Sequence, residues 1–135
     1  MVFIGPYEHH SNELPWRESI AQVGTIDEDA DGRVDLAHLE SHGVRVGLGT
    51  DVGAGTSFSQ LQSLNEAYKV LQLQGQKLDP FKAFYLATLG GARSLYLDDR
   101  IGSLQAGKEA DFVVLDYEAT PLISYRLKQS KSLEE

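Results

Sequence analysis

The stretch from Val44 to Asp51 constrains the fold more than any other part of the chain. Its sequence, VRVGLGTD, is a short apolar run that ends on a carboxylate, and Gly53 and Gly55 follow it. The run predicts a buried strand, and folds built on parallel strands present functional acids at the ends of those strands. Glycines after the acid let the backbone approach a ligand closely. The pattern predicts a functional carboxylate at Asp51, and the alternative is an acid that only caps a turn or a helix.

Two helices are predicted after this strand. Apolar residues recur at spacings of three and four over residues 59–73, which is typical of an amphipathic helix. The next helix opens with Asp79 as N-cap and Pro80 at its first position, and we expect it to end at Gly90 and Gly91. A strand followed by helices indicates an α/β fold.

Other elements are shorter. Asp35 is a candidate N-cap for a helix over residues 35–41. Further strands are predicted at residues 2–4, 23–26, 101–104 and 110–116. One strand with two helices cannot bury both faces of the strand. We therefore expect the part after residue 43 to be a piece of a larger fold.

Composition excludes several classes of function. The chain has 135 residues, of which 20 are acidic and 12 basic, giving a formal net charge of −8. Nucleic acids and anionic membranes both attract clustered Lys and Arg, so neither is expected as a partner. The absence of cysteine excludes disulfides, thiol nucleophiles and Cys-ligated zinc. With no apolar run near the ~20 residues of a membrane span, a cytoplasmic location is the expectation.

Four segments closely resemble the carboxyl-terminal part of guanine deaminases of the amidohydrolase superfamily. They are GVRVGLGTDVGAGTSFS at 43–59, NEAYK at 65–69, DPFKAFYLATLGGAR at 79–93 and DRIGSLQAGKEADFVVLD at 99–116. The resemblance assigns residues 41–135 to that part. It implies an incomplete domain: a partial (β/α)8-barrel segment, with the last strand and its helices, plus strands of a small β-sandwich.

The same resemblance implies a role for Asp51. In that family the acid that ends the eighth strand binds zinc and moves a proton, so Asp51 becomes both a metal ligand and a catalytic residue. The implied cofactor is zinc, the substrate is guanine, and the products are xanthine and ammonia.

The other ligands of such a site have no counterpart in this chain. The family uses a His-x-His pair, further histidines and a glutamate, whereas histidines occur here only at 9, 10, 38 and 42. Side chains of adjacent residues point to opposite faces of a strand, so His9 and His10 could not both bind one ion from it. One ligand falls short of the three or four that zinc requires. We expect the chain alone to be inactive.

Residues 1–40 resemble a different family. The segments GPYEHHSN at 5–12 and LPWRE at 14–18 are similar to class V aminotransferases of the cysteine-desulfurase type. This resemblance implies that His9 stacks on the ring of pyridoxal phosphate, but the lysine and aspartate that complete such a site have no counterpart. The simplest interpretation is a fused or mis-assembled reading frame joined near residue 41.

Two further interpretations stay open. Residues 27–35 fit the start of a calcium-binding EF-hand loop, but the twelfth position holds His38 in place of Glu, so an acidic turn is favoured. The chain could also be a non-catalytic domain that folds by forming a homo-oligomer or by binding a partner, because its separated elements need other surfaces to cover them.

Overall fold

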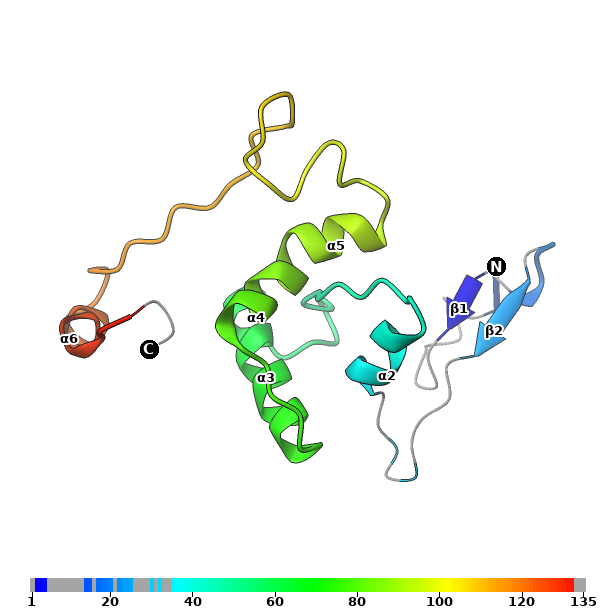
Figure 1. The fold of residues 1–135 in the computed structure, drawn as a ribbon, viewed down its shortest axis with the longest axis horizontal. Helices are drawn as coiled ribbons and strands as arrows, with labels where there is room; N and C mark the ends of the chain where they lie inside the picture. The colour runs from blue at the N-terminus through cyan, green and yellow to red at the C-terminus, as the bar shows by residue number, and fades with distance from the viewer. Residues whose placement is uncertain are drawn as a thin grey trace. The chain divides into compact units, whose positions relative to one another are not determined.

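The computed structural model divides the chain into two compact units, Met1–Val44 and Arg45–Glu135, which are described separately (Figure 1). The residues that it describes are 2–4, 14, 15, 17–20, 22–25, 30, 32 and 35–132. Among these residues, no helix is long and apolar enough to cross a membrane.

The first unit contains two short strands and one helix. Strand β1 (Val2–Ile4) and strand β2 (Val23–Thr25) pair in parallel, with Val2 opposite Val23. Both strands were predicted from the sequence and are confirmed. Helix α2 (Leu36–Ser41) begins after Asp35, whose Oδ1 accepts a hydrogen bond from the His38 backbone N–H at 3.0 Å. The predicted N-cap is therefore confirmed. His9 and most of the EF-hand candidate lie outside the described residues.

The second unit is helical. It contains α3 (Gln60–Leu73), α4 (Pro80–Ala87), α5 (Leu89–Ser94) and α6 (Pro121–Gln129). Asp79 caps α4 as predicted, since its Oδ1 accepts from the Lys82 N–H at 3.0 Å and Pro80 follows at the first helical position. Helix α4 packs against both α3 and α5 (Figure 1).

A small apolar core lies where these three helices meet. Its buried side chains are Leu64, Leu71, Leu78, Leu86 and Ala92. The predicted stripe on α3 is only partly covered, because Leu61 and Tyr68 each remain 47% exposed. Burial of apolar surface is the main force that holds helices together. This core therefore holds α3, α4 and α5 in place, together with the segments that contact them.

The helix expected to end at Gly90 and Gly91 is in fact two helices. Helix α4 ends at Ala87, Thr88 leaves helical geometry at φ −127° and ψ −99°, and α5 includes both glycines. A Cβ on Gly90 would lie 2.8 Å from the Tyr85 carbonyl oxygen. Gly90 therefore allows the start of α5 to lie close to α4, and the glycine pair is not a helix stop.

Three predicted strands are not formed. Residues 44–50, 101–104 and 110–116 all lie in irregular backbone. A strand exists only when a neighbouring strand completes its hydrogen bonds. The strands within the described part of the chain, β1 and β2, pair with each other and not with residues 44–48. The sequence predicted where α2, α3 and α4 begin, to within one residue, and failed where strands needed distant partners.

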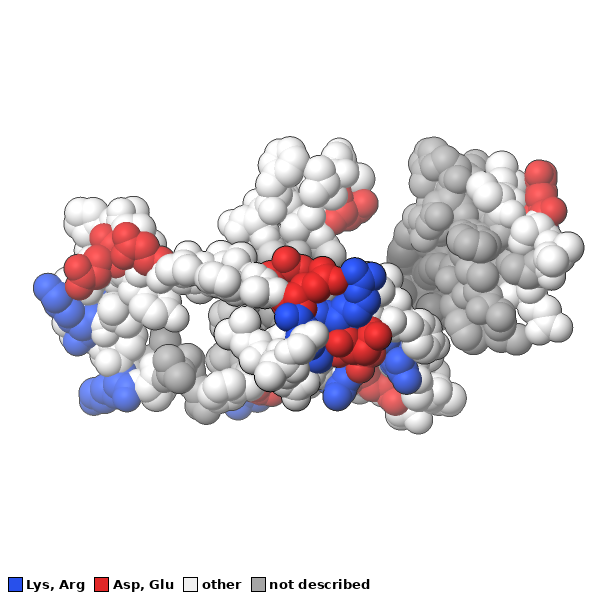
Figure 2. All heavy atoms as spheres, turned by 90° about the horizontal axis from the view of Figure 1, so that it is seen from above, with Lys and Arg blue, Asp and Glu red and all other residues white. Residues whose placement is uncertain are grey.

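Charged side chains of both signs lie next to one another on the face drawn in Figure 2. Ion pairs join Arg100 to Glu109, Lys69 to Glu66 at 2.9 Å, and Arg93 to Asp98 at 3.6 Å. All of these side chains are at least 39% exposed, so each pair contributes at most about 1 kcal/mol.

Replacing Asp79 by alanine tests the cap of α4. The variant loses the bond to the Lys82 N–H, and its free energy of unfolding should fall by about 1 kcal/mol. Ser59→Ala is the matched control, because Ser59 precedes α3 in the same way but makes no side-chain capping bond. Its effect should stay within about 0.5 kcal/mol. Urea unfolding followed by circular dichroism measures both, and equal losses would contradict the stabilising role of the Asp79 cap.

Candidate functional site

Asp51 lies at the start of a tight glycine-rich turn. Its backbone is in the left-handed region at φ 51°, and its side chain is exposed. The Asp51 carbonyl accepts hydrogen bonds from the N–H groups of Ala54 and Gly55, at 3.1 and 2.5 Å. A Cβ on Gly55 would lie 1.8 Å from the Thr50 carbonyl oxygen, so only glycine fits there. The turn leaves the carboxylate of Asp51 facing solvent, where a ligand could reach it.

The segment before Asp51 is held by hydrogen bonds to two helices. The Leu48 N–H donates to the Leu86 carbonyl of α4 at 3.0 Å. The Gln60 side-chain amide, at the start of α3, donates to the Leu48 carbonyl at 2.6 Å. Both backbone groups of Leu48 are therefore satisfied by helices. No local sequence pattern predicts these contacts, because they join residues far apart in the chain.

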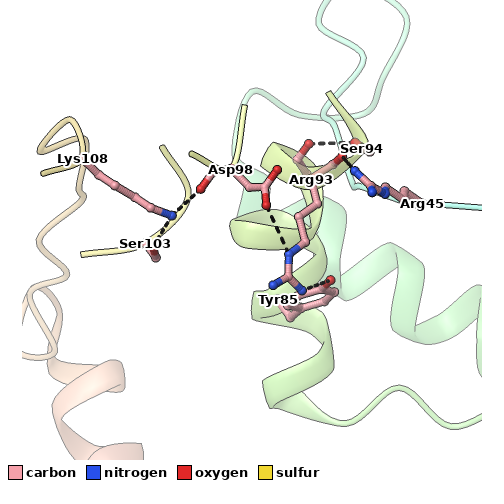
Figure 3. A network of polar contacts seen from close by, with 8 residues as sticks. Arg45, Tyr85, Arg93, Ser94, Asp98, Ser103 and Lys108 are labelled. Carbon is pink, nitrogen blue, oxygen red and sulfur yellow. Dashed lines mark hydrogen bonds and ion pairs between the residues drawn. The ribbon is translucent and has the colours of Figure 1, made fainter. Parts of the chain in front are cut away.

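The third helix meets the same segment through a close backbone approach. A Cβ on Gly47 would lie 2.6 Å from the Gly91 Cα and 2.9 Å from the Ser94 hydroxyl oxygen. The Arg45 guanidinium also donates to the Arg93 carbonyl at the end of α5, at 3.2 Å (Figure 3). Helices α3, α4 and α5 together fix the path of the chain up to Asp51.

Arg93 lies at the centre of the polar network drawn in Figure 3. Its guanidinium donates to the Tyr85 hydroxyl at 3.3 Å and pairs with the Asp98 carboxylate at 3.6 Å. The hydrogen bond to Tyr85, with a further contribution from Asp98, raises the pKa of Arg93 above its ordinary value. Arg93 is thus a permanent cation that ties α4, α5 and the following loop together.

Lys108 fastens the next loop in the same network. Its ammonium group donates to the Asp98 carbonyl and to the Ser103 hydroxyl, the latter at 2.9 Å (Figure 3). Tyr96 has a left-handed backbone at φ 57°, and the Arg45 guanidinium lies 4.8 Å from the centre of its ring. A cation over an aromatic face is attractive and offsets part of the strain of such a backbone.

The described residues do not fit zinc on their own. Nowhere in the part of the chain that the structure describes do three His, Cys, Asp or Glu side chains come together to hold a metal ion. Asp51 offers an oxygen ligand that zinc accepts, but zinc needs three or four protein ligands. His9 and His10 lie outside the described residues.

Gly47→Ala tests the close approach that positions Asp51. The new methyl group would collide with the Gly91 backbone, so we expect a loss of about 1–3 kcal/mol in the free energy of unfolding. Gly49→Ala is the matched control two residues away, where a Cβ meets nothing within 4 Å. Its effect should stay within about 0.5 kcal/mol. The midpoint of urea unfolding, at an unchanged m-value, gives the loss in free energy of unfolding for each variant. A Gly47 variant as stable as the Gly49 variant would show that the approach is not tight.

Comparisons with known proteins give consistent results. The model of the amidohydrolase family matches residues 9–133. The chain is 66% identical over 90 residues to the guanine deaminase of Escherichia coli K12, an alignment that covers 67% of this chain and 20% of that protein. It is 43% identical over 100 residues to a probable guanine deaminase of Deinococcus radiodurans, covering 72% of this chain and 23% of that protein.

The structural comparison agrees. The solved structure of E. coli guanine deaminase superposes with a TM-score of 0.71 at 60% identity, covering 74% of this chain and 23% of that chain. The chain thus spans about a fifth of the length of the curated relatives it matches, 20% and 23%.

Proposed function

Because the chain belongs to the amidohydrolase family, we propose that it takes part in the hydrolytic deamination of guanine, with Asp51 as the catalytic carboxylate. The observation that carries the proposal is the placement of Asp51, exposed in a glycine turn at the end of a segment that three helices hold. The resemblance to guanine deaminases, expected from the sequence, is confirmed by the 66% identity to the E. coli protein.

Family membership implies a fold of the (β/α)8-barrel type. We propose that residues 44–48 act as the last strand of that barrel once neighbouring strands are present. Asp51 would then follow the carboxyl end of the strand, where the active sites of such barrels lie.

The proposed reaction adds water to the ring carbon that carries the amino group. The C–N bond then breaks, ammonia leaves and xanthine remains. One proton has to move from the attacking water to the departing amine, and a carboxylate within hydrogen-bond reach can carry it. We assign this transfer to Asp51, because its side chain is exposed while its backbone is fixed.

Zinc is the cofactor that we propose for the whole site, where it would lower the pKa of bound water toward ~7. Asp51 would supply one ligand, and the remaining ligands have to come from outside the described residues. The aminotransferase interpretation of residues 1–40, with His9 on pyridoxal phosphate, gains no support from a family model that already begins at residue 9. That interpretation, a homo-oligomer and a cytoplasmic location stay predictions.

The chain alone should not deaminate guanine, since Asp51 by itself cannot hold a catalytic zinc ion. Pure protein mixed with zinc and guanine should release no ammonia above a protein-free control. Steady release that disappears on chelation would contradict the assignment of a single ligand.

A chimera tests Asp51 directly. The 90 residues of this chain that align with E. coli guanine deaminase at 66% identity would replace the matching fifth of that protein. We expect the chimera to release ammonia from guanine and Asp51→Asn to lower kcat by roughly 10²–10⁴-fold, since the proton carrier is lost.

Asp111→Asn is the matched control for the chimera. Asp111 is also an exposed acid, and its replacement by asparagine removes the same charge. Its activity should match that of the parent chimera. Circular dichroism and zinc content confirm that each variant is folded and loaded. A folded, zinc-loaded Asp51→Asn chimera with full activity would overturn the proposal.

A further inference from the structure

We propose that His38 and His42 of the first unit form a two-histidine site for a divalent transition-metal ion, with Cu²⁺ preferred over Ni²⁺ and Zn²⁺. The two residues are one helical turn apart, and both are exposed. Their ring centroids lie 4.4 Å apart with an angle of 44° between the ring planes. Residues four apart share one face of a helix, so both imidazoles are presented on the same side.

The hydrogen bonds of His42 leave one ring nitrogen available for a metal. Nδ1 lies 2.9 Å from the His38 carbonyl oxygen and 3.1 Å from the Ser41 hydroxyl oxygen. The Ser41 hydroxyl donates its own proton to that same carbonyl, at 2.7 Å. Because a carbonyl oxygen only accepts, Nδ1 has to carry the proton, and the neutral ring then has its lone pair on Nε2.

This arrangement matches the surroundings of histidines that bind metals. A metal-binding histidine almost always donates its other ring N–H to a carbonyl or carboxylate, which fixes the tautomer and the ring orientation. The His38 carbonyl supplies that acceptor for His42.

The short helix that carries His38, with His42 as its C-cap residue, is held by hydrogen bonds at its two ends. Asp35 caps its start through the His38 N–H at 3.0 Å. At its other end, Gly43 takes a left-handed backbone at φ 74°, and the Val44 N–H donates back to the Leu39 carbonyl at 3.1 Å. Ligands that are already held in place lose less conformational freedom when an ion binds.

The choice of metal follows from the number and type of ligands. Two exposed imidazoles leave the other coordination positions to water, and a mixed N and O set in tetragonal geometry suits Cu²⁺ and Ni²⁺. Among divalent first-row ions Cu²⁺ binds such ligands most tightly. A structural zinc site would need four protein ligands, and the described residues bring no three together. The site is therefore separate in both ligands and metal from the zinc proposed at Asp51.

Titration with Cu²⁺ tests the site in a full-length chain that carries His9→Ala and His10→Ala, so that His38 and His42 are the only histidines left. Calorimetry should show one equivalent of Cu²⁺ bound in the micromolar range, and electron paramagnetic resonance should show nitrogen ligands. His38→Ala and His42→Asn should each weaken binding roughly 10²-fold, because each removes the second point of attachment.

Two comparisons keep the outcome clear. His42→Asn places asparagine, a residue common at helix C-termini, at the end of α2. The circular dichroism spectrum of this variant has to match that of the parent before its Cu²⁺ affinity is compared. Asp51→Asn should leave Cu²⁺ binding unchanged, so the result does not depend on whether Asp51 is catalytic. Unaltered binding after both His38 and His42 are replaced, or saturation only at millimolar Cu²⁺, would overturn the proposal.

Discussion

The hydrogen bonds on the two sides of Leu48 are the constraint on which the proposed site depends. In a sheet, a neighbouring strand would satisfy the N–H and C=O of this residue. Here the carbonyl of Leu86 in α4 accepts from the Leu48 N–H, and the side-chain amide of Gln60 in α3 donates to the Leu48 C=O. Leaving either group buried and unpaired would cost about 1–3 kcal/mol. The path of the chain toward Asp51 is therefore set by two helices whose own packing rests on a small leucine core.

Glycine makes this arrangement possible through the space it leaves free. Gly47 lets the segment touch the backbone of α5, and Gly90 lets the start of α5 lie close to Tyr85 of α4. Arg93 then ties Asp98 of the following loop to α5, and Lys108 joins two points of that loop, Asp98 and Ser103. The segments at 43–59 and 79–93, which resemble guanine deaminases, thus contact each other directly just before Asp51, although only Asp51 itself carries the proposed chemistry.

Sequence reasoning succeeded where the determining interactions are local. The caps at Asp35 and Asp79 were predicted because each bonds an N–H three residues away. It failed for the strands at 44–48, 101–104 and 110–116, which need partners elsewhere. The candidate site divides in the same way, since the local pattern alone predicts Asp51, whose role stays a proposal. The bond from Gln60 spans 12 residues and could not be derived from local sequence.

The engaged backbone of Leu48 also limits how residues 44–50 can join a larger barrel. A residue whose single backbone N–H is bonded to a helix has no donor left to offer a neighbouring strand. Leu48 must then stand at the end of any ladder that residues 44–47 form, and Asp51 falls in the loop beyond it. Loops beyond the carboxyl ends of strands are where barrels of this type carry out chemistry. The contacts that replace the missing ladder are thus compatible with Asp51 reaching a substrate once the remaining ligands surround it.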